Sequence, residues 1–552
     1  MIPRRSALRT ACVLAACAAT LPACRTTIPV TSSVPAPAAG VVTPPTSGVY
    51  AEPHRPQYHF TPPSQWMNDP NGMVFYEGEY HLFYQYHPQG NTWGPMHWGH
   101  AISTDLVRWE HLPIALYPDS LGLIFSGSAV VDWKNTSGFG TNGKPPMVAM
   151  FTYHDMAKEK AGTSTFQTQG LAYSTDRGRT WVKYAGNPVI PNPGIRDFRD
   201  TKVLWHEASQ RWIMIMSGGD RVRLYSSYNL REWQPASEFG ATLGAHGGVW
   251  ECPDLFPVRV EGTNEVRWVM LVSINPGGPN GGSATQYFVG HFDGMTFTLD
   301  STFATAVGAA GVEPSRGVWL DYGRDNYAGV TWSDVPVSDG RRLFLGWMSN
   351  WDYAQVVPTE AWRSATTVPR ALTLRRTPAG LRVYSTPVQE LRLLRDQTTT
   401  LRDGQVSGEQ TLHVPRGGSA AMSEVDLEFV PSASGQTTVA IELTNAGGEV
   451  YRVGYDAPTK RFFSDRTGLP RAFSPKFAAA VHYAPRVAGD SAVRLHLFID
   501  RSSVELFGDG GATPLTDLVF PTSDFTAMKL VVTGPAVRLR YATISSLRSI
   551  WR

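Results

Sequence analysis

The chain has 552 residues, enough for two to four domains with large hydrophobic cores. Its 49 basic and 47 acidic residues leave a formal net charge of +2, so composition provides no electrostatic attraction to nucleic acid or to an acidic polymer. Aromatic residues form 11% of the chain and include 17 tryptophans, which suits a neutral carbohydrate stacking on rings, although most of these tryptophans are expected in the core.

Residues 1–23 are predicted to be an export signal. Three arginines within the first nine residues precede an apolar run, 11–21, that is shorter than the about 20 residues a membrane-spanning helix needs. The letters LPAC at 21–24 are typical of a bacterial lipoprotein cleavage box, in which Cys24 becomes the lipidated first residue. Ordinary signal-peptidase cleavage near Ala23 is the alternative, and the paired arginines also suggest twin-arginine export.

Residues 24–52 are rich in Thr, Pro, Ser, Ala and Val without periodicity, which predicts a disordered linker. Cys12 and Cys17 leave with the signal, so Cys252 is the only thiol expected in the folded body and no internal disulfide is predicted. No convincing His–Asn pattern accompanies Cys252, so we expect it to pack and to hold its neighbour in place rather than to act as a nucleophile.

The heptapeptide WMNDPNG occupies residues 66–72. Its Asn, Pro and Gly residues predict a tight turn that holds Asp69 on a stiff loop. A plain turn is the simpler interpretation, but it requires neither Trp66 nor Asp69. Asp69 is therefore a candidate nucleophile or sugar-binding acid, a role that needs a second carboxylate.

Two further acidic motifs provide partners. Glu251 lies between Trp and Cys in WECPDLF (250–256), and apolar neighbours that desolvate a carboxyl group suit a general acid working near neutral pH. Arg199 precedes Asp200 in DFRDTK (197–202), a pair that can hold adjacent hydroxyls through charge-assisted hydrogen bonds. Taken singly, a surface glutamate and a surface salt bridge would explain them. Their joint occurrence favours an active site.

The region 53–373 contains an internal repeat, a Ser-x-Asp/Asn turn followed by an aromatic residue. It occurs at 103–109, 174–181 and 227–233, and more loosely at 292–297. Each interval is about one four-stranded sheet with its loops, which predicts a β-propeller. Residues 374–394 are expected to connect it to a second domain, 395–552. Short alternating strands between turn residues, such as 424–430, 437–443, 493–499 and 530–532, predict a β-sandwich in a supporting role.

The acidic motifs, with FSGSA at 125–129 and LGWMSNW at 345–351, resemble glycoside hydrolase family 32, which comprises invertases, inulinases and levanases. The similarity runs from about residue 58 to 370, and DRSSVE at 500–505 is similar to the family's second domain. WGPMHWGHA at 93–101 and TEAWRSA at 359–365 look most like bacterial levanases. The resemblance implies an all-β fold, a five-bladed β-propeller followed by a C-terminal β-sandwich. Thr201 departs from the usual proline, for which we expect a local loop adjustment without loss of activity.

The same resemblance implies a retaining mechanism. Asp69 would be the nucleophile, Glu251 the acid and base, and Asp200 the residue that favours the oxocarbenium-like transition state. Retention requires the two working carboxyl groups to lie about 5–5.5 Å apart. The resemblance assigns substrate contacts to Trp66, Asn68, Gln85, Trp93, Phe125, Ser126, Arg199 and Trp347.

We therefore expect an exported or surface-anchored, monomeric β-fructofuranosidase that hydrolyses levan, with inulin and sucrose as further substrates. It would use no cofactor, bind no nucleic acid and reach a membrane only through lipid on Cys24. No metal is expected, because the zinc-like spacing of His97 and His100 lacks further ligands. The alternatives are an endo-levanase or fructosyltransferase of the same fold, a sialidase, or a fructan-binding lipoprotein without catalysis.

Overall fold

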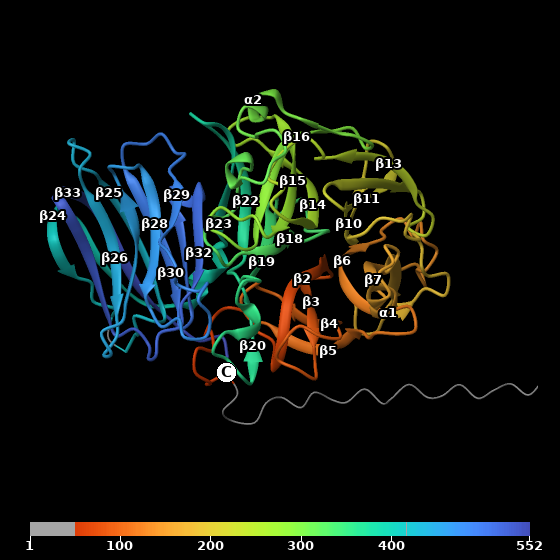
Figure 1. Cartoon of the computed structure of the whole chain (residues 1–552), viewed down its shortest axis with the longest axis horizontal. Helices are drawn as coiled ribbons and strands as arrows, with labels where there is room; N and C mark the ends of the chain where they lie inside the picture. Colours follow the sequence, from red (N-terminus) through yellow and green to blue (C-terminus); the bar gives the residue numbers. More distant parts are fainter. Residues whose placement is uncertain (1–49, 416, 552) are drawn as a thin grey trace, which may run out of the picture. The chain divides into compact units, whose positions relative to one another are not determined.

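The computed structural model describes residues 50–415 and 417–551, so the predicted signal, Cys24 and most of the predicted linker lie outside the described residues. Strands dominate the described part, as Figure 1 shows. Within it, no helix is long and apolar enough to cross a membrane. The helical segments are α1 (Met156–Lys160), α2 (Ser301–Ala304), and the 3-10 turns η1 (Pro314–Arg316), η2 (Ala354–Val356), η3 (Gln389–Leu394) and η4 (Asp509–Gly511).

Five antiparallel sheets follow one another along the chain and form the blades of a β-propeller. Blade 1 contains β2 (Gln65–Tyr76), β3 (Glu79–His87), β4 (His97–Ser103) and β5 (Glu110–Leu116). Blade 2 contains β6 (Leu123–Val131), β7 (Met147–His154), β8 (Gln167–Ser174) and β9 (Val182–Lys183). Blade 3 contains β10 (Phe198–His206), β11 (Arg211–Gly218), β12 (Val222–Ser227) and β13 (Gln234–Phe239). Blade 4 contains β14 (Val249–Arg259), β15 (Val266–Asn275), β16 (Ala284–Phe292) and β17 (Phe297–Leu299). Blade 5 contains β18 (Tyr327–Thr331), β19 (Arg342–Met348), β21 (Ala365–Thr366), β22 (Arg370–Thr377) and β23 (Gly380–Pro387).

The first strand of each blade lines the propeller axis. β2, β6, β10, β14 and β18 each contact the next in that order, and β18 contacts β2, so the five strands form a closed ring. A late segment, β20 (Trp362–Arg363), pairs in parallel with the start of β2 and ties the first blade to the last part of the propeller.

The sequence repeat marks the same turn in four blades, the one between the third and fourth strands. Asp105 accepts hydrogen bonds from two backbone N–H groups of this turn, and Asn229 and Asp293 do the same in their blades. Carboxylate and amide oxygens satisfy turn donors in this way, which explains why the repeat was readable in the sequence. Blade 5 lacks the repeat, since its last two strands are joined by Pro378 and Ala379.

The predicted end of the propeller at residue 373 is too early. β22 pairs with β19 and with β23, so most of the expected connecting segment, 374–394, belongs to blade 5. Only η3 connects the blade to the second domain. The predicted linker also extends too far, because the ring of Tyr50 stacks on that of Trp551 at 3.8 Å and Glu52 pairs with Arg55 at 2.8 Å.

The C-terminal domain is a β-sandwich built around one long strand. Its strands are β24 (Arg395–Thr411), β25 (Ser423–Val430), β26 (Thr438–Thr444), β27 (Val450–Asp456), β28 (Arg461–Gly468), β29 (His482–Pro485), β30 (Val493–Asp500), β31 (Ser503–Gly508), β32 (Thr513–Leu518) and β33 (Ala527–Leu547). β33 pairs with β26 over 527–533 and with β25 over 538–546. Gly534, at φ +94°, separates the two halves, so β33 serves both layers around one shared core.

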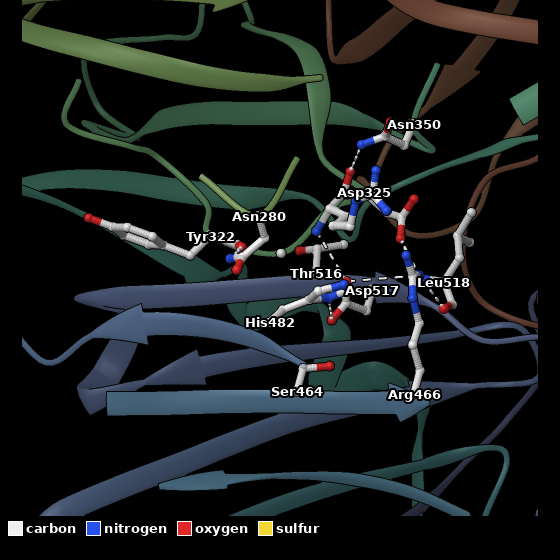
Figure 2. A network of polar contacts seen from close by, with 12 residues as sticks. Asn280, Tyr322, Asp325, Asn350, Ser464, Arg466, His482, Thr516, Asp517 and Leu518 are labelled. Carbon is white, nitrogen blue, oxygen red and sulfur yellow. Dashed lines mark hydrogen bonds and ion pairs between the residues drawn. The ribbon is translucent and has the colours of Figure 1, made fainter. Parts of the chain in front are cut away.

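Buried ion pairs hold the sandwich against the propeller. Arg466, fully buried on β28, donates to Asp325 at 2.8 Å, as Figure 2 shows. It also donates to the hydroxyl of Tyr353 at 2.7 Å. Nearby, Asp517 accepts from His482 at 2.9 Å. Charges buried this deeply must be paired, so the two domains are locked in one arrangement by groups contributed from both.

Candidate active site

Every strand of the axial ring is interrupted by a β-bulge, and in four of the five strands the bulge lies beside a predicted site residue. The pairing register shifts between Met67 and Pro70 in β2, Phe125 and Gly127 in β6, Arg199 and Lys202 in β10, Glu251 and Asp254 in β14, and Tyr327 and Val330 in β18. Bulges of this kind turn a side chain away from the regular pleat. Asp200 and Cys252 adopt φ values of +66° and +45°, and positive φ is rare for residues other than glycine.

Asp69 does not lie in a turn, contrary to the sequence-based prediction. Residues 66–72 are part of β2, and its two bulges contain Asp69 and Gly72. Asn68 donates to Oδ1 of Asp69 at 3.0 Å, and Ser126 donates to Oδ2 at 2.7 Å. Burial raises the pKa of Asp69, while these hydrogen bonds lower it and favour the carboxylate that a nucleophile requires.

Trp66 and Cys252 complete the support of Asp69. The indole N–H of Trp66 donates to the Asn68 side chain at 2.8 Å, which fixes the amide that contacts Asp69. The thiol of Cys252 lies 3.4 Å from Oδ2 of Asp69. Burial raises the pKa of Cys252 well above its usual value, and the neighbouring carboxylates raise it further, so the sulfur remains a protonated donor.

Asp200 is held by the backbone. The N–H of Cys252 donates to its Oδ2 at 3.0 Å, and the thiol of Cys252 lies 3.6 Å from the same oxygen. Burial raises the pKa of Asp200 to about 7 against the lowering effect of the Arg199 cation, and the charges of Glu251 and Asp69 raise it further. Cys252 therefore bridges Asp69 and Asp200, whereas the sequence suggested that it holds Glu251.

Glu251 is surrounded by polar donors and not by the apolar neighbours expected from its sequence. Oε1 accepts from Arg199 at 2.8 Å, and Oε2 accepts from the hydroxyl of Tyr327. Trp250 is turned into the core, where its indole N–H donates to the carbonyl of Ala245. Strand alternation explains this, because residues adjacent in sequence face opposite sides of β14.

Arg199 links Glu251 to Asp200 in a way that the sequence did not predict. Its closest approach to Asp200 is 3.8 Å, and its shorter hydrogen bonds go to Glu251 and to Asp197, the latter at 2.6 Å. Through Arg199 and Cys252, the side chains of Asp69, Asp200 and Glu251 share one site although they come from three blades.

Aromatic residues surround this site. Trp66, Trp347 and Tyr327 belong to one buried cluster with Cys252, and Trp93, Phe125 and Trp351 pack against it half-buried. Trp93 meets Phe125 edge-on at 6.0 Å. The indole N–H of Trp347 and the amide Nε2 of Gln85, on β3 beside β2, are buried without an acceptor among the described residues. Unpaired buried donors are costly, so both are suited to a hydroxyl-bearing ligand.

Sequence reasoning missed Tyr327 and Asp197. Tyr327 belongs to no recognisable motif, so no local signal identified it. Asp197 lies two residues before Arg199, just ahead of β10, and the closeness of the two opposite charges in the sequence could have suggested the pair. Thr201, buried inside the bulge of β10, has a hydroxyl without a partner in the described part of the chain.

The chain belongs to glycoside hydrolase family 32 and is a glycoside hydrolase. The family's N-terminal domain matches residues 59–387, and its C-terminal domain matches residues 388–547. The boundary between them coincides with the end of blade 5.

Characterised relatives extend over nearly all of the described chain. A levanase of Bacillus subtilis (strain 168) is 48% identical over 92% of this chain and 72% of its own length. The extracellular exo-inulinase of Aspergillus niger (strain CBS 513.88) is 40% identical over 91% of this chain and 96% of its own length. Among solved structures, the exo-inulinase of Aspergillus awamori has a TM-score of 0.81 at 38% identity, covering 91% of this chain and 100% of that one. A β-fructofuranosidase of Schwanniomyces occidentalis, complexed with fructosyl-erythritol, has a TM-score of 0.77 at 32% identity, covering 91% of this chain and 99% of that one.

Proposed function

We propose that this protein is a retaining β-fructofuranosidase that releases fructose from fructans, with levan as the preferred polymer. The observation that carries the proposal is the meeting of Asp69 and Glu251, from blades 1 and 4, around Cys252 and Arg199. The levanase and exo-inulinase relatives support the substrate class.

The proposed reaction has two displacements. Asp69 attacks the anomeric carbon of a terminal fructofuranosyl unit, and the bond to the leaving oxygen breaks as that oxygen takes a proton from Glu251. Glu251 then removes a proton from water, whose oxygen attacks the same carbon and releases fructose from Asp69. Each carboxyl group thus returns to its starting state.

The remaining groups position the reactants. Ser126 and Asn68 hold Asp69, and Arg199 with Tyr327 fixes both oxygens of Glu251. Asp200 would accept hydrogen bonds from ring hydroxyls, and these hydrogen bonds strengthen as the ring gains positive charge. Gln85 and Trp347 would donate to the sugar, and Trp93 and Phe125 would pack against it.

Product chromatography after digestion of levan, inulin and sucrose in parallel tests this proposal. Fructose alone from the first time point, fastest with levan, is the expected result. A ladder of oligosaccharides would mean internal cleavage, and transfer products would mean a fructosyltransferase. Depletion of levan from solution with no reducing sugar released would mean a binding protein and would overturn the assignment.

We further propose that the protein is an exported monomer anchored through lipid on Cys24. The proposal rests on the LPAC letters at 21–24 and on the extracellular relatives. Mass spectrometry of the mature N-terminus tests it, and Cys24→Ala is expected to release the protein from the membrane fraction. Light scattering would show whether the protein is a monomer.

A further inference from the structure

A second cavity lies at the opposite end of the propeller axis from the three acids. The active-site residues Ser126, Asp200 and Glu251 come from the first halves of their strands. The second cavity is lined by residues from the middle and later parts of β6, β10, β14 and β18. On β14, Phe256 in its wall lies five positions after Glu251, which is about 16 Å at about 3.3 Å per residue.

The two sites do not communicate. Between them lies a void of about 10 Å³ lined by Asp200, Cys252 and Lys202. A void of that size holds about one water molecule, so no sugar passes along the axis. The second cavity, with a volume of about 380 Å³, is within the range of about 300–1,000 Å³ typical of small-molecule sites.

Arg342, at the start of β19, is a cation without a protein partner in this cavity. Its guanidinium makes no hydrogen bond or ion pair within residues 50–415 and 417–551, and its Nε is buried. Its guanidinium lies 5.2 Å from the ring centroid of Phe256. Burial lowers the pKa of Arg342 against the effect of Asp254 and Asp334. A buried guanidinium without a hydrogen-bond partner is stabilised by a ligand that supplies an acceptor oxygen.

Asp334 faces the same cavity as an acceptor without a paired cation. Its two oxygens accept from the indole N–H of Trp133 and the backbone N–H of Val131, both at 2.8 Å. Burial raises the pKa of Asp334 to about 6 although these hydrogen bonds lower it. The other charged groups of the lining are paired, Lys202 with Asp254 at 3.6 Å and Lys134 with Glu207 at 3.5 Å.

This combination fits a neutral polyhydroxyl ligand better than an ion. An anion would meet Asp334, and a cation would meet Arg342, whereas adjacent hydroxyls can accept from the guanidinium and donate to the carboxylate together. Trp133 supplies an open aromatic platform, because it is 60% exposed. The neighbouring Trp205 is covered by the ammonium group of Lys134, 4.5 Å from its ring centroid.

We propose that this cavity is a second, non-catalytic sugar site that holds a fructofuranosyl unit of the polymer, with Trp133, Arg342 and Asp334 as its contacts. The choice of fructan as the ligand rests on the proposed function. A site on the far side of the propeller would keep a long chain near the enzyme between cleavage events without occupying the catalytic pocket.

The direct test measures the fluorine NMR signal of a labelled Trp133. Protein carrying Asp69→Asn and labelled with 5-fluorotryptophan is titrated with levan oligosaccharides, and the Trp133 signal is assigned by its loss in Trp133→Phe. A saturable shift of that signal, abolished by Arg342→Gln, is expected. An unchanged Trp133 signal would overturn the proposal, and so would a shift with maltose oligosaccharides that equals the shift with levan oligosaccharides.

The functional test separates the distal site from the catalytic one. In the active enzyme, Trp133→Ala is expected to raise KM for long levan about tenfold while leaving kcat/KM for sucrose unchanged. Tyr228→Ala is the matched control, since Tyr228 is 65% exposed but lies outside the cavity. Equal kinetics of Trp133→Ala and Tyr228→Ala on levan would overturn the proposal. Failure of the proposed function would be seen separately, because the unsubstituted enzyme would then release no fructose from levan. That measurement is independent of the Trp133 signal.

Discussion

Arg199 donates two hydrogen bonds to one oxygen of Glu251, through Nη2 at 2.8 Å and Nε at 3.2 Å. Tyr327 donates to the other oxygen, so a half-buried glutamate has both oxygens fixed before any substrate binds. Such preorganisation places the carboxyl group of a general acid without further movement.

Glu251→Gln tests this role through the leaving group. The amide keeps the size of the side chain but supplies no acidic proton, so turnover of levan and sucrose is expected to fall by about 100- to 10,000-fold. A fructoside with an activated leaving group needs no protonation and is expected to lose far less. Equal losses on both kinds of substrate, measured as initial rates, would argue against the acid role.

Asp69→Asn is expected to reduce turnover by several orders of magnitude and to leave the fold intact, because an amide accepts from Ser126 but does not attack the anomeric carbon. Rates on sucrose and circular dichroism spectra provide the measurement. Near-normal activity of a pure, folded preparation would refute the nucleophile assignment.

The thiol of Cys252 is expected to be unreactive in the native enzyme. It is 5% exposed, and burial together with nearby Asp200 and Asp69 raises its pKa, which disfavours the thiolate. Incubation with iodoacetamide at pH 8 should leave the activity of the folded enzyme and the mass of its Cys252 peptide unchanged. Protein unfolded in urea should gain an adduct at Cys252. Rapid modification of folded protein would contradict the placement of Cys252.

His59 predicts a pH-dependent stability. It is buried between Asp500, 2.8 Å from Nδ1, and Glu505, 2.9 Å from Nε2. Burial alone would lower the pKa of His59, but its two hydrogen-bonded carboxylates raise it to about 9. Because the folded value exceeds the unfolded value of about 6.5, the stabilisation is complete below pH 6.5 and is lost as pH rises through about 9.

Urea unfolding of His59→Gln at several pH values tests that prediction. The variant should be less stable than the parent at pH 6, and the difference should shrink by pH 10. His413→Gln, at an exposed position, provides the control and should leave the profile unchanged. A pH-independent difference between His59→Gln and the parent would show that His59 contributes packing alone.

Arg466→Met tests the lock between propeller and sandwich. The substitution leaves buried Asp325 without its cation, so we expect a loss of about 3–5 kcal/mol in the free energy of unfolding. Arg538→Met removes an exposed pair with Asp403 and should have no measurable effect. Similar unfolding curves for the two variants would mean that the buried pair contributes little.

Much of the fold could be predicted because its signals are local. The repeated turn identified four blades, and alternation predicted strands at 424–430, 437–443 and 493–499, each within one residue of β25, β26 and β30. The predicted strand at 530–532 is only part of the 21-residue β33, because a strand that pairs with different partners in two layers carries no simple alternation.

The three acids were found in the sequence, but their environments were not. Adjacent residues suggested that Trp250 and Cys252 surround Glu251, whereas Tyr327 and Arg199 from other blades do. Contacts between blades depend on the bulges in β10 and β14, and no local pattern marks a bulge. Residue types therefore suggested the chemistry, whereas the hydrogen bonds of these acids required the tertiary structure.

The bulges have a consequence for how such an enzyme changes over time. Blades 1, 3 and 4 each present an acidic side chain at an irregularity of the axial strand. Substitutions in the three outer strands therefore leave the orientation of those side chains unchanged. Loops between strands can lengthen without changing the pairing register of any sheet. Specificity is free to diversify while the reaction stays the same.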